Sequence, residues 1–239
     1  MQQSNGYIIG FAFALTIILG GLLSGAAVSL KPAQKEAIAL DTRKQILSAV
    51  METKGVDKRE LSKEYDKKVK SMVVDFEGKV VEGEVAEKVD IRKEYKKKPE
   101  ARLYPVFMYS EAGTDKVDAY ILPTYGLGLW DNIWGFLAVK PDLNTVAGYS
   151  MDHKGETPGL GARITDASVQ NRYKGQKLFN DNGDLVSVSM IKGEGNPNLD
   201  QHTIDGMSGA TITGDGVNKM LENYVGYYKN YFAKLRKAS

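Results

Sequence analysis

The sequence contains no cysteine and only two histidines, His153 and His202. Without cysteine the chain cannot form disulfides, ligate iron–sulfur clusters through thiolates, attach a c-type haem or carry a cysteinyl flavin. A histidine-based metal site is also not expected, because such sites usually draw on several histidine or cysteine ligands. Any redox chemistry of this chain would therefore come from an organic cofactor.

The chain also lacks a strong excess of either charge. It has 32 basic and 30 acidic residues, for a net charge of +2. This balance argues against a nucleic-acid-binding arm and against a disordered acidic tail. An apolar content of 42% is enough for a hydrophobic core, and 239 residues suffice for one globular domain plus an anchor.

Residues 7–30 contain no charged side chain. As a helix this stretch would be roughly 36 Å long, which is enough to cross a bilayer core of about 30 Å. We expect a tail over residues 1–6 and a transmembrane helix over 7–30 that ends at Pro32. A cleaved signal peptide is the alternative, since residues 24–27 resemble a small-residue cleavage zone, but a basic segment before the apolar run is missing.

The charges around this span favour a cytoplasmic domain. The flanking cations, which include Lys31, Lys35, Arg43 and Lys44, all follow the span. The positive-inside rule would keep that side in the cytoplasm, although long domains can translocate against this bias.

The remainder of the sequence predicts a helical connector over residues 31–70 and an α+β domain over 71–239. The connector combines a helix over 33–50 with a charged, exposed helical segment over 52–70. An apolar stripe from Val217 to Phe232 predicts a final helix that begins near Thr213 or Asp215. Runs rich in β-branched and aromatic residues predict strands over 70–76, 79–81, 104–109, 117–122, 135–139, 145–150 and 185–190.

The heptapeptide of residues 205–211, with the sequence DGMSGAT, is the strongest candidate site. Its small residues let backbone amides approach an anion, and the helix that follows would point its positive dipole end toward the turn. Thr211 would offer a hydroxyl there. From the residues alone, a glycine-rich turn that only caps the last helix is the favoured interpretation, because such turns are abundant.

Two further segments have the composition of cofactor-binding loops. Residues 153–161, HKGETPGLG, fit either a rigid surface loop or the wall of a pocket for a planar ligand, with Thr157 bonding the polar ring edge. Residues 125–130, YGLGLW, together with Trp134, fit either core packing or the apolar wall of a flavin site. A metal site at His153 and Glu156 is disfavoured because glycine and proline surround them.

A hydrolase triad of Ser208, His153 and Asp205 is disfavoured as well. No G-x-S-x-G nucleophile elbow surrounds Ser208.

The three segments, in this order behind one apolar span, resemble the C subunit of the sodium-translocating NADH:quinone oxidoreductases. Residues 205–211 are similar to the D-x-x-S-G-A-T flavinylation motif of this family, and 156–161 to its E-T-P-G-L-G segment. The resemblance implies a single FMN-binding domain with an antiparallel sheet, and FMN bound to Thr211 through a phosphoester. It implies no catalytic residue and no metal ligand in this chain. The implied cofactor-binding residues are Thr211, Asp205, Ser208, Gly209, Ala210, Thr213, Glu156, Thr157, Leu160, Gly161 and Trp130.

The resemblance further implies a partner set and a location. The chain would relay electrons among other subunits during NADH-to-quinone transfer coupled to sodium export, while NADH and quinone bind elsewhere. A flavin transferase would attach FMN, and the domain would lie in the periplasm, anchored in the bacterial inner membrane by one span. No nucleic-acid partner is implied. The alternatives are the homologous flavin subunit of a ferredoxin:NAD oxidoreductase complex and a flavin-free, membrane-anchored scaffold.

Overall fold

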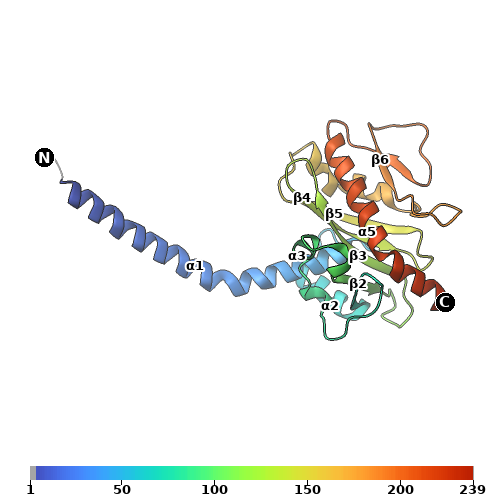
Figure 1. Cartoon of the computed structure of the whole chain (residues 1–239), viewed down its shortest axis with the longest axis horizontal. Coiled ribbons are helices and arrows are strands. Elements are labelled where there is room, and N and C mark those ends of the chain that lie inside the picture. The colour runs from blue at the N-terminus through green and yellow to red at the C-terminus, as the bar shows by residue number, and fades with distance from the viewer. Residues whose placement is uncertain (1–3, 239) are drawn as a thin grey trace. The chain divides into compact units, whose positions relative to one another are not determined.

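The computed structural model describes residues 4–238, and the chain divides after Thr42 into two units. Nearly all of the first unit lies in helix α1 (Asn5–Ser48), which is long and apolar enough to cross a membrane (Figure 1). Its side chains from Asn5 to Ala39 are exposed within the chain. An apolar helix surface of this kind is stable in a bilayer rather than in water.

The expected helix end at Pro32 is wrong, because α1 continues through this residue. The separate helix expected over residues 33–50 is therefore the second half of α1. A proline removes one backbone donor and bends a helix without always ending it, and α1 is bent along its length in Figure 1.

The charged connector contains helix α2 (Lys58–Lys68), as the sequence predicts. The expected exposure of this segment is wrong in part, because Leu61 and Tyr65 of α2 are buried in the core. The side chain of Asp57 caps its first turn and accepts a hydrogen bond from the Arg59 amide at 2.8 Å.

The second unit is built on a five-stranded antiparallel sheet in the order β1-β2-β3-β4-β5. Five of the seven predicted strands correspond to these five, but β3 extends further toward the glycine-rich segment. Residues 79–81 form only a bridge between Val80 and Val74, so the strand expected there is wrong. The strands are β1 (Val69–Val74), β2 (Tyr104–Tyr109), β3 (Ala119–Leu127), β4 (Asn132–Val139) and β5 (Val146–His153).

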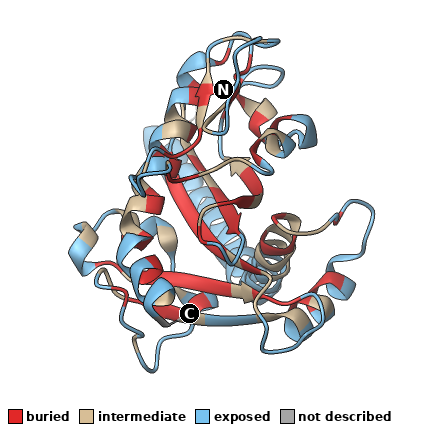
Figure 2. Ribbon diagram, turned by 90° about the vertical axis from the view of Figure 1, so that its right-hand side faces the viewer, coloured by how far each residue is buried: buried red, intermediate tan, exposed pale blue. Residues whose placement is uncertain are grey.

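Helices cover both faces of this sheet (Figure 2). The buried side of α5 (Thr211–Ala238), including Val217 and Phe232, packs with Leu122 and Leu137 of the sheet. Residues from the end of α1 and from α2 pack against the opposite face. This arrangement, with an apolar helix followed by an antiparallel sheet and packing helices, confirms the predicted α+β fold.

A small two-stranded sheet lies next to the start of α5. Strand β6 (Ser189–Ile191) pairs in parallel with β7 (Thr203–Asp205). The sequence predicts a longer strand over residues 185–190 and does not predict β7, because three-residue strands carry too little periodicity. The remaining short elements are η1 (Ala86–Lys88), α3 (Ile91–Tyr95), η2 (Pro99–Ala101), η3 (Gly161–Thr165), α4 (Ala167–Gln170) and η4 (Asn171–Tyr173).

Candidate functional site

Thr211 is exposed and is the first residue of α5. The helix therefore begins before the predicted start, which was near Thr213 or Asp215. The Gly214 amide donates to the Ala210 carbonyl at 3.0 Å, which is the first hydrogen bond of the helical ladder. The hydroxyl of Thr213 looks like a cap in the sequence, but it is bonded elsewhere.

The turn before Thr211 is tight and anchored in the core. The Ala210 amide donates to the Met207 carbonyl at 3.0 Å, and the side chains of Met207 and Ala210 are buried. Gly209 has a φ of 77°, a conformation that favours glycine. Ser208 lies exposed at the tip of the turn. The turn thus presents Thr211 at the surface on a rigid base.

The first-turn amides of α5 are not used by the helical ladder. Among the described residues, the amides of Thr211, Ile212 and Thr213 have no hydrogen-bond acceptor. Unpaired amides and the positive end of a long helix dipole together favour a negatively charged group at this position.

Glu156 connects the three segments that the sequence singled out. Its carboxylate accepts a hydrogen bond from the Thr213 hydroxyl at 2.6 Å and one from the Trp130 amide at 3.0 Å. The side chain is only 4% exposed. A buried carboxylate needs such donors, because an unpaired buried charge is strongly unfavourable. The loop of Trp130, the loop of Glu156 and the start of α5 are therefore fixed to one another.

Two glycines make room for this carboxylate. A Cβ atom added to Gly128 or Gly161 would collide with the Glu156 carboxylate oxygens, and at Gly161 also with the Thr213 hydroxyl. Both positions therefore require glycine for steric reasons.

Five apolar side chains from these segments remain exposed around the start of α5, and we call them the apolar rim. A Cβ atom added to Gly209 would lie 2.9 Å from Leu160, which places this side chain beside the turn. Exposed apolar side chains gathered at one place mark a surface that binds an apolar ligand or partner. The rim consists of Leu127, Leu129, Trp130, Leu160 and Ile212.

Asp205 binds the neighbouring loop. Its carboxylate accepts hydrogen bonds from the Asn196 amide at 2.9 Å, the Asn196 side chain at 2.6 Å and the Gly195 amide at 3.0 Å. The hydrogen bonds from Asn196 hold the pKa of Asp205 below its usual value. Asp205 is thus occupied by backbone and amide donors of the loop that follows β6.

A second contact holds the same loop. Glu194 accepts hydrogen bonds from Arg163 at 2.7 Å and from Arg172 at 3.3 Å, and the Arg163 contact lowers the pKa of Glu194. Arg172 also donates to the carbonyls of Asp205 and Gly206. No motif in the sequence marks these arginines.

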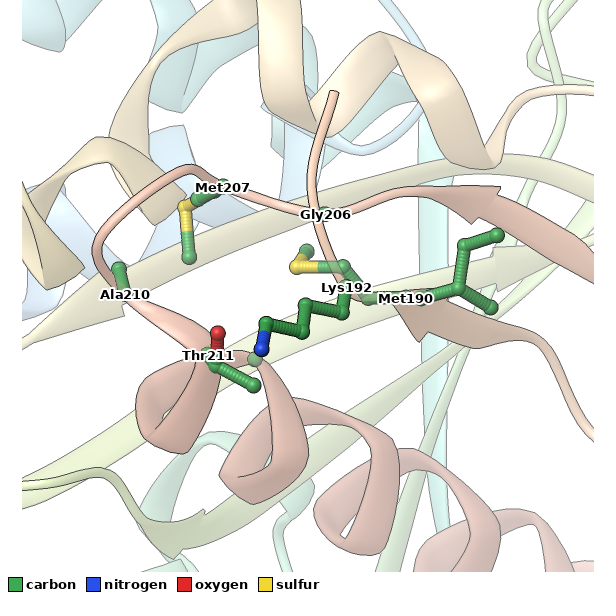
Figure 3. A pocket seen from close by; sticks show the side chains of 8 residues that line it. Met190, Lys192, Gly206, Met207, Ala210 and Thr211 are labelled. Carbon is green, nitrogen blue, oxygen red and sulfur yellow. The ribbon is translucent and has the colours of Figure 1, made fainter. Parts of the chain in front are cut away.

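Lys192 is another residue near Thr211 that no sequence motif marks. It follows β6 directly and lines the same small hollow as Thr211, and its amine ends beside the Thr211 side chain (Figure 3). The only signal in the sequence is a lysine just after an apolar run, which is common.

The alternative interpretations of His153 gain no support from its contacts. Its Nδ1 accepts a hydrogen bond from the Glu156 amide at 3.2 Å. Within residues 4–238, no group of three histidine, aspartate or glutamate side chains could hold a metal ion. Since Asp205 bonds the loop after β6, it does not orient a histidine for a hydrolase triad.

Comparisons with known proteins agree with this geometry. Residues 128–226 match the FMN-binding domain family. The chain is 33% identical to the C subunit of the Na(+)-translocating NADH-quinone reductase of Pseudomonas aeruginosa over 99% of this chain and 98% of that protein. It is 31% identical to the protein of the same name from Vibrio campbellii, over 99% and 95% of the two chains.

Two solved structures share the fold. The crystal structure of the C subunit of Na(+)-translocating NADH-quinone reductase from Parabacteroides distasonis has a TM-score of 0.75 at 35% identity, covering 84% of this chain and 96% of that chain. NqrC from Shewanella oneidensis has a TM-score of 0.73 at 32% identity, covering 85% and 100%. The match over nearly the full length, with the FMN-binding domain around Glu156 and Thr211, shows that this chain belongs to the NqrC family, the C subunits of Na⁺-translocating NADH-quinone reductases.

Proposed function

We propose that this chain carries FMN covalently on Thr211 and relays electrons within a sodium-translocating NADH:quinone oxidoreductase. The observation that carries the proposal is the exposed Thr211 hydroxyl at the start of α5, next to amides without acceptors. The bound flavin would supply reversible electron transfer, and the chain would supply its attachment and position.

The residues around Thr211 suit the phosphate end of FMN. A phosphoester on the threonine keeps a negative charge, which the amides of Thr211, Ile212 and Thr213 and the helix dipole stabilise. Ser208 adds a hydroxyl donor at the turn, while Gly209 and Ala210 leave the approach open. Thr211 therefore matches the chemistry of a phosphoester.

The flavin ring would lie over the surface. The hollow beside Thr211 holds about 10 Å³, which is room for one water molecule and far too little for a three-ring system. The exposed Trp130 and Leu160 of the apolar rim offer apolar contact, and the exposed Thr157 offers a hydroxyl to the polar ring edge. A surface position leaves the ring accessible to neighbouring electron carriers.

Glu156, Gly161 and Thr213 would support the cofactor by position. The side chains of Glu156 and Thr213 hydrogen-bond each other in the interior, and Gly161 makes room for them. Asp205 would act in the same indirect way through its loop.

The location and the partners follow from the proposed role. One membrane span would anchor the chain in the bacterial inner membrane, with the flavin domain in the periplasm and other subunits of the complex as redox partners. A flavin transferase would use FAD as donor: the Thr211 oxygen bonds to the FMN phosphorus, the pyrophosphate bond breaks, and AMP leaves with the hydroxyl proton.

Mass spectrometry of the native protein tests the attachment. We expect a mass increase of one FMN less one water, mapped to the peptide that contains Thr211. Thr211→Ala should abolish the label with the domain folded, and Thr165→Ala, at an exposed threonine outside the site, should retain it. An unmodified protein from cells with a working transferase would refute the redox role and favour the flavin-free scaffold.

Two further measurements complete the test. Co-purifying subunits distinguish a sodium-translocating NADH:quinone oxidoreductase from a ferredoxin:NAD oxidoreductase. A reporter fused after Ser239 that is active only in the cytoplasm would contradict the periplasmic location.

A further inference from the structure

We propose that Lys192 supplies the positive charge that pairs with the phosphodiester on Thr211, and that Asp205 acts on the cofactor by holding the loop of Lys192. This inference rests on the proposed attachment of FMN to Thr211. It assigns a role to a residue outside the three cofactor-binding segments.

The fold brings Lys192 to Thr211 through the contact between β6 and α5. Asn218 of α5 accepts a hydrogen bond from the Met190 amide at 2.7 Å and donates to the Met190 carbonyl at 2.9 Å. A Cβ atom on Gly214 would lie 3.1 Å from the Met190 sulfur, so the strand lies directly against the first turns of the helix. The residue after β6 is therefore beside the start of α5, where Figure 3 shows the Lys192 amine next to Thr211.

The loop that follows Lys192 is fixed at several points. Asp205 binds the amides of Gly195 and Asn196, and Glu194 bonds both Arg163 and Arg172. A Cβ atom on Gly206 would collide with the Ile191 carbonyl, so the backbone at Gly206 passes very close to the end of β6. A side chain on an anchored loop loses less entropy on pairing than one on a free loop.

The charged groups around Thr211 leave the Lys192 amine available to pair with an added anion. Among the described residues, no acidic side chain forms an ion pair with Lys192. Two of the nearby carboxylates, Glu194 and Asp205, are bonded to arginines and to loop donors, while Asp215 lies exposed one turn further along α5. A phosphodiester on Thr211 would thus meet one uncompensated cation from β6 and the amides from α5.

The test compares Lys192→Gln with the parent chain, each with and without FMN. The full-length chain in detergent is prepared from cells with and without the transferase, and mass spectrometry establishes the flavin content. Unfolding in urea is followed by fluorescence of Trp130 and Trp134, both in the second unit. We expect the substitution to raise the unfolding equilibrium constant about two- to fivefold more with FMN than without it, which is the size of a partly exposed charge pair.

Three controls make the comparison specific. Lys219→Gln removes an exposed charge two helical turns further along α5 and should show no such dependence on FMN. Lys192→Arg should behave nearly as the parent chain, because it keeps the positive charge. The extra effect of Lys192→Gln in the presence of FMN should become smaller in 0.5 M salt. In a chain that carries Asp205→Asn, Lys192→Gln should change the unfolding equilibrium constant less than in the parent chain, since the loop no longer holds the lysine in place.

The outcomes are distinguishable. A larger effect of Lys192→Gln with FMN, together with a shifted ³¹P resonance of the phosphodiester, supports the pairing. An equal effect with and without FMN overturns it while leaving the attachment intact. A parent chain without a Thr211 label overturns both proposals.

Discussion

Replacing Thr213 by valine tests whether the buried carboxylate of Glu156 fixes the site. Valine has nearly the shape of threonine but cannot donate, so one Glu156 oxygen loses its 2.6 Å hydrogen bond. A hydrogen bond to a charged group contributes about 1.5–3 kcal/mol, and the oxygen left buried adds to the loss. We expect the free energy of unfolding to fall by about 2–3 kcal/mol.

The assay is urea unfolding of the FMN-free chain, followed by tryptophan fluorescence. With a slope of about 2–3 kcal/mol per molar urea, the midpoint should fall by roughly 1 M. Thr165→Val is the matched control, because its exposed hydroxyl bonds only the Ala162 carbonyl within its own loop, and its effect should stay within about 0.5 kcal/mol.

Glu156→Gln separates hydrogen bonding from charge. A glutamine can still accept from the Trp130 amide while its NH₂ group donates to the Thr213 hydroxyl, so stability should change by less than about 1 kcal/mol. A Thr213→Val effect as small as that of Thr165→Val would refute the idea that this carboxylate joins the three segments.

Three further changes follow from the same geometry. Gly161→Ala places a Cβ against Glu156 and should destabilise the chain by about 1–3 kcal/mol in the urea assay. Gly209→Ala must adopt a φ of 77° and approaches Leu160, so it should cost about 1–2 kcal/mol and lower the fraction of labelled protein seen by mass spectrometry. Glu194 has a lowered pKa because of Arg163, so its contribution to stability is present above the unfolded pKa, near 4.5, and is lost as the pH falls through the folded value. The destabilisation by Glu194→Gln, measured by urea unfolding, should therefore be seen at pH 7 and shrink progressively as the pH falls below 4.5.

The main architecture of the second unit could be predicted from the sequence, because its strands and last helix carry long periodic patterns. The stripe from Val217 to Phe232 packs against the sheet as expected. Pro32 was misleading because the rule that proline ends a helix is a tendency, and α1 tolerates the missing donor. Strand β7 was missed because three residues show no period, so its pairing with β6 depends on tertiary contacts.

The candidate site shows the same limit. The sequence places Thr211 in a turn just before a helix that starts near Thr213 or Asp215, whereas α5 begins at Thr211 itself. The apparent cap, Thr213, instead bonds Glu156 from 57 residues away in the sequence. Lys192 was missed for a related reason. Its place beside Thr211 depends on the contact between β6 and Asn218, which no pattern in either segment encodes.

The two carboxylates of the motif segments have a common property that bears on an anionic cofactor. Glu156 accepts from Thr213 and Trp130, and Asp205 accepts from the loop after β6. A free carboxylate near a phosphodiester would repel it, whereas one whose oxygens are directed at protein donors presents less negative charge to its surroundings. Acidic residues can therefore lie beside an anion site when their donors come from the loops they hold. By this reasoning a substitution that removes the donors, such as Thr213→Val, should harm the site more than Glu156→Gln, which removes the charge itself.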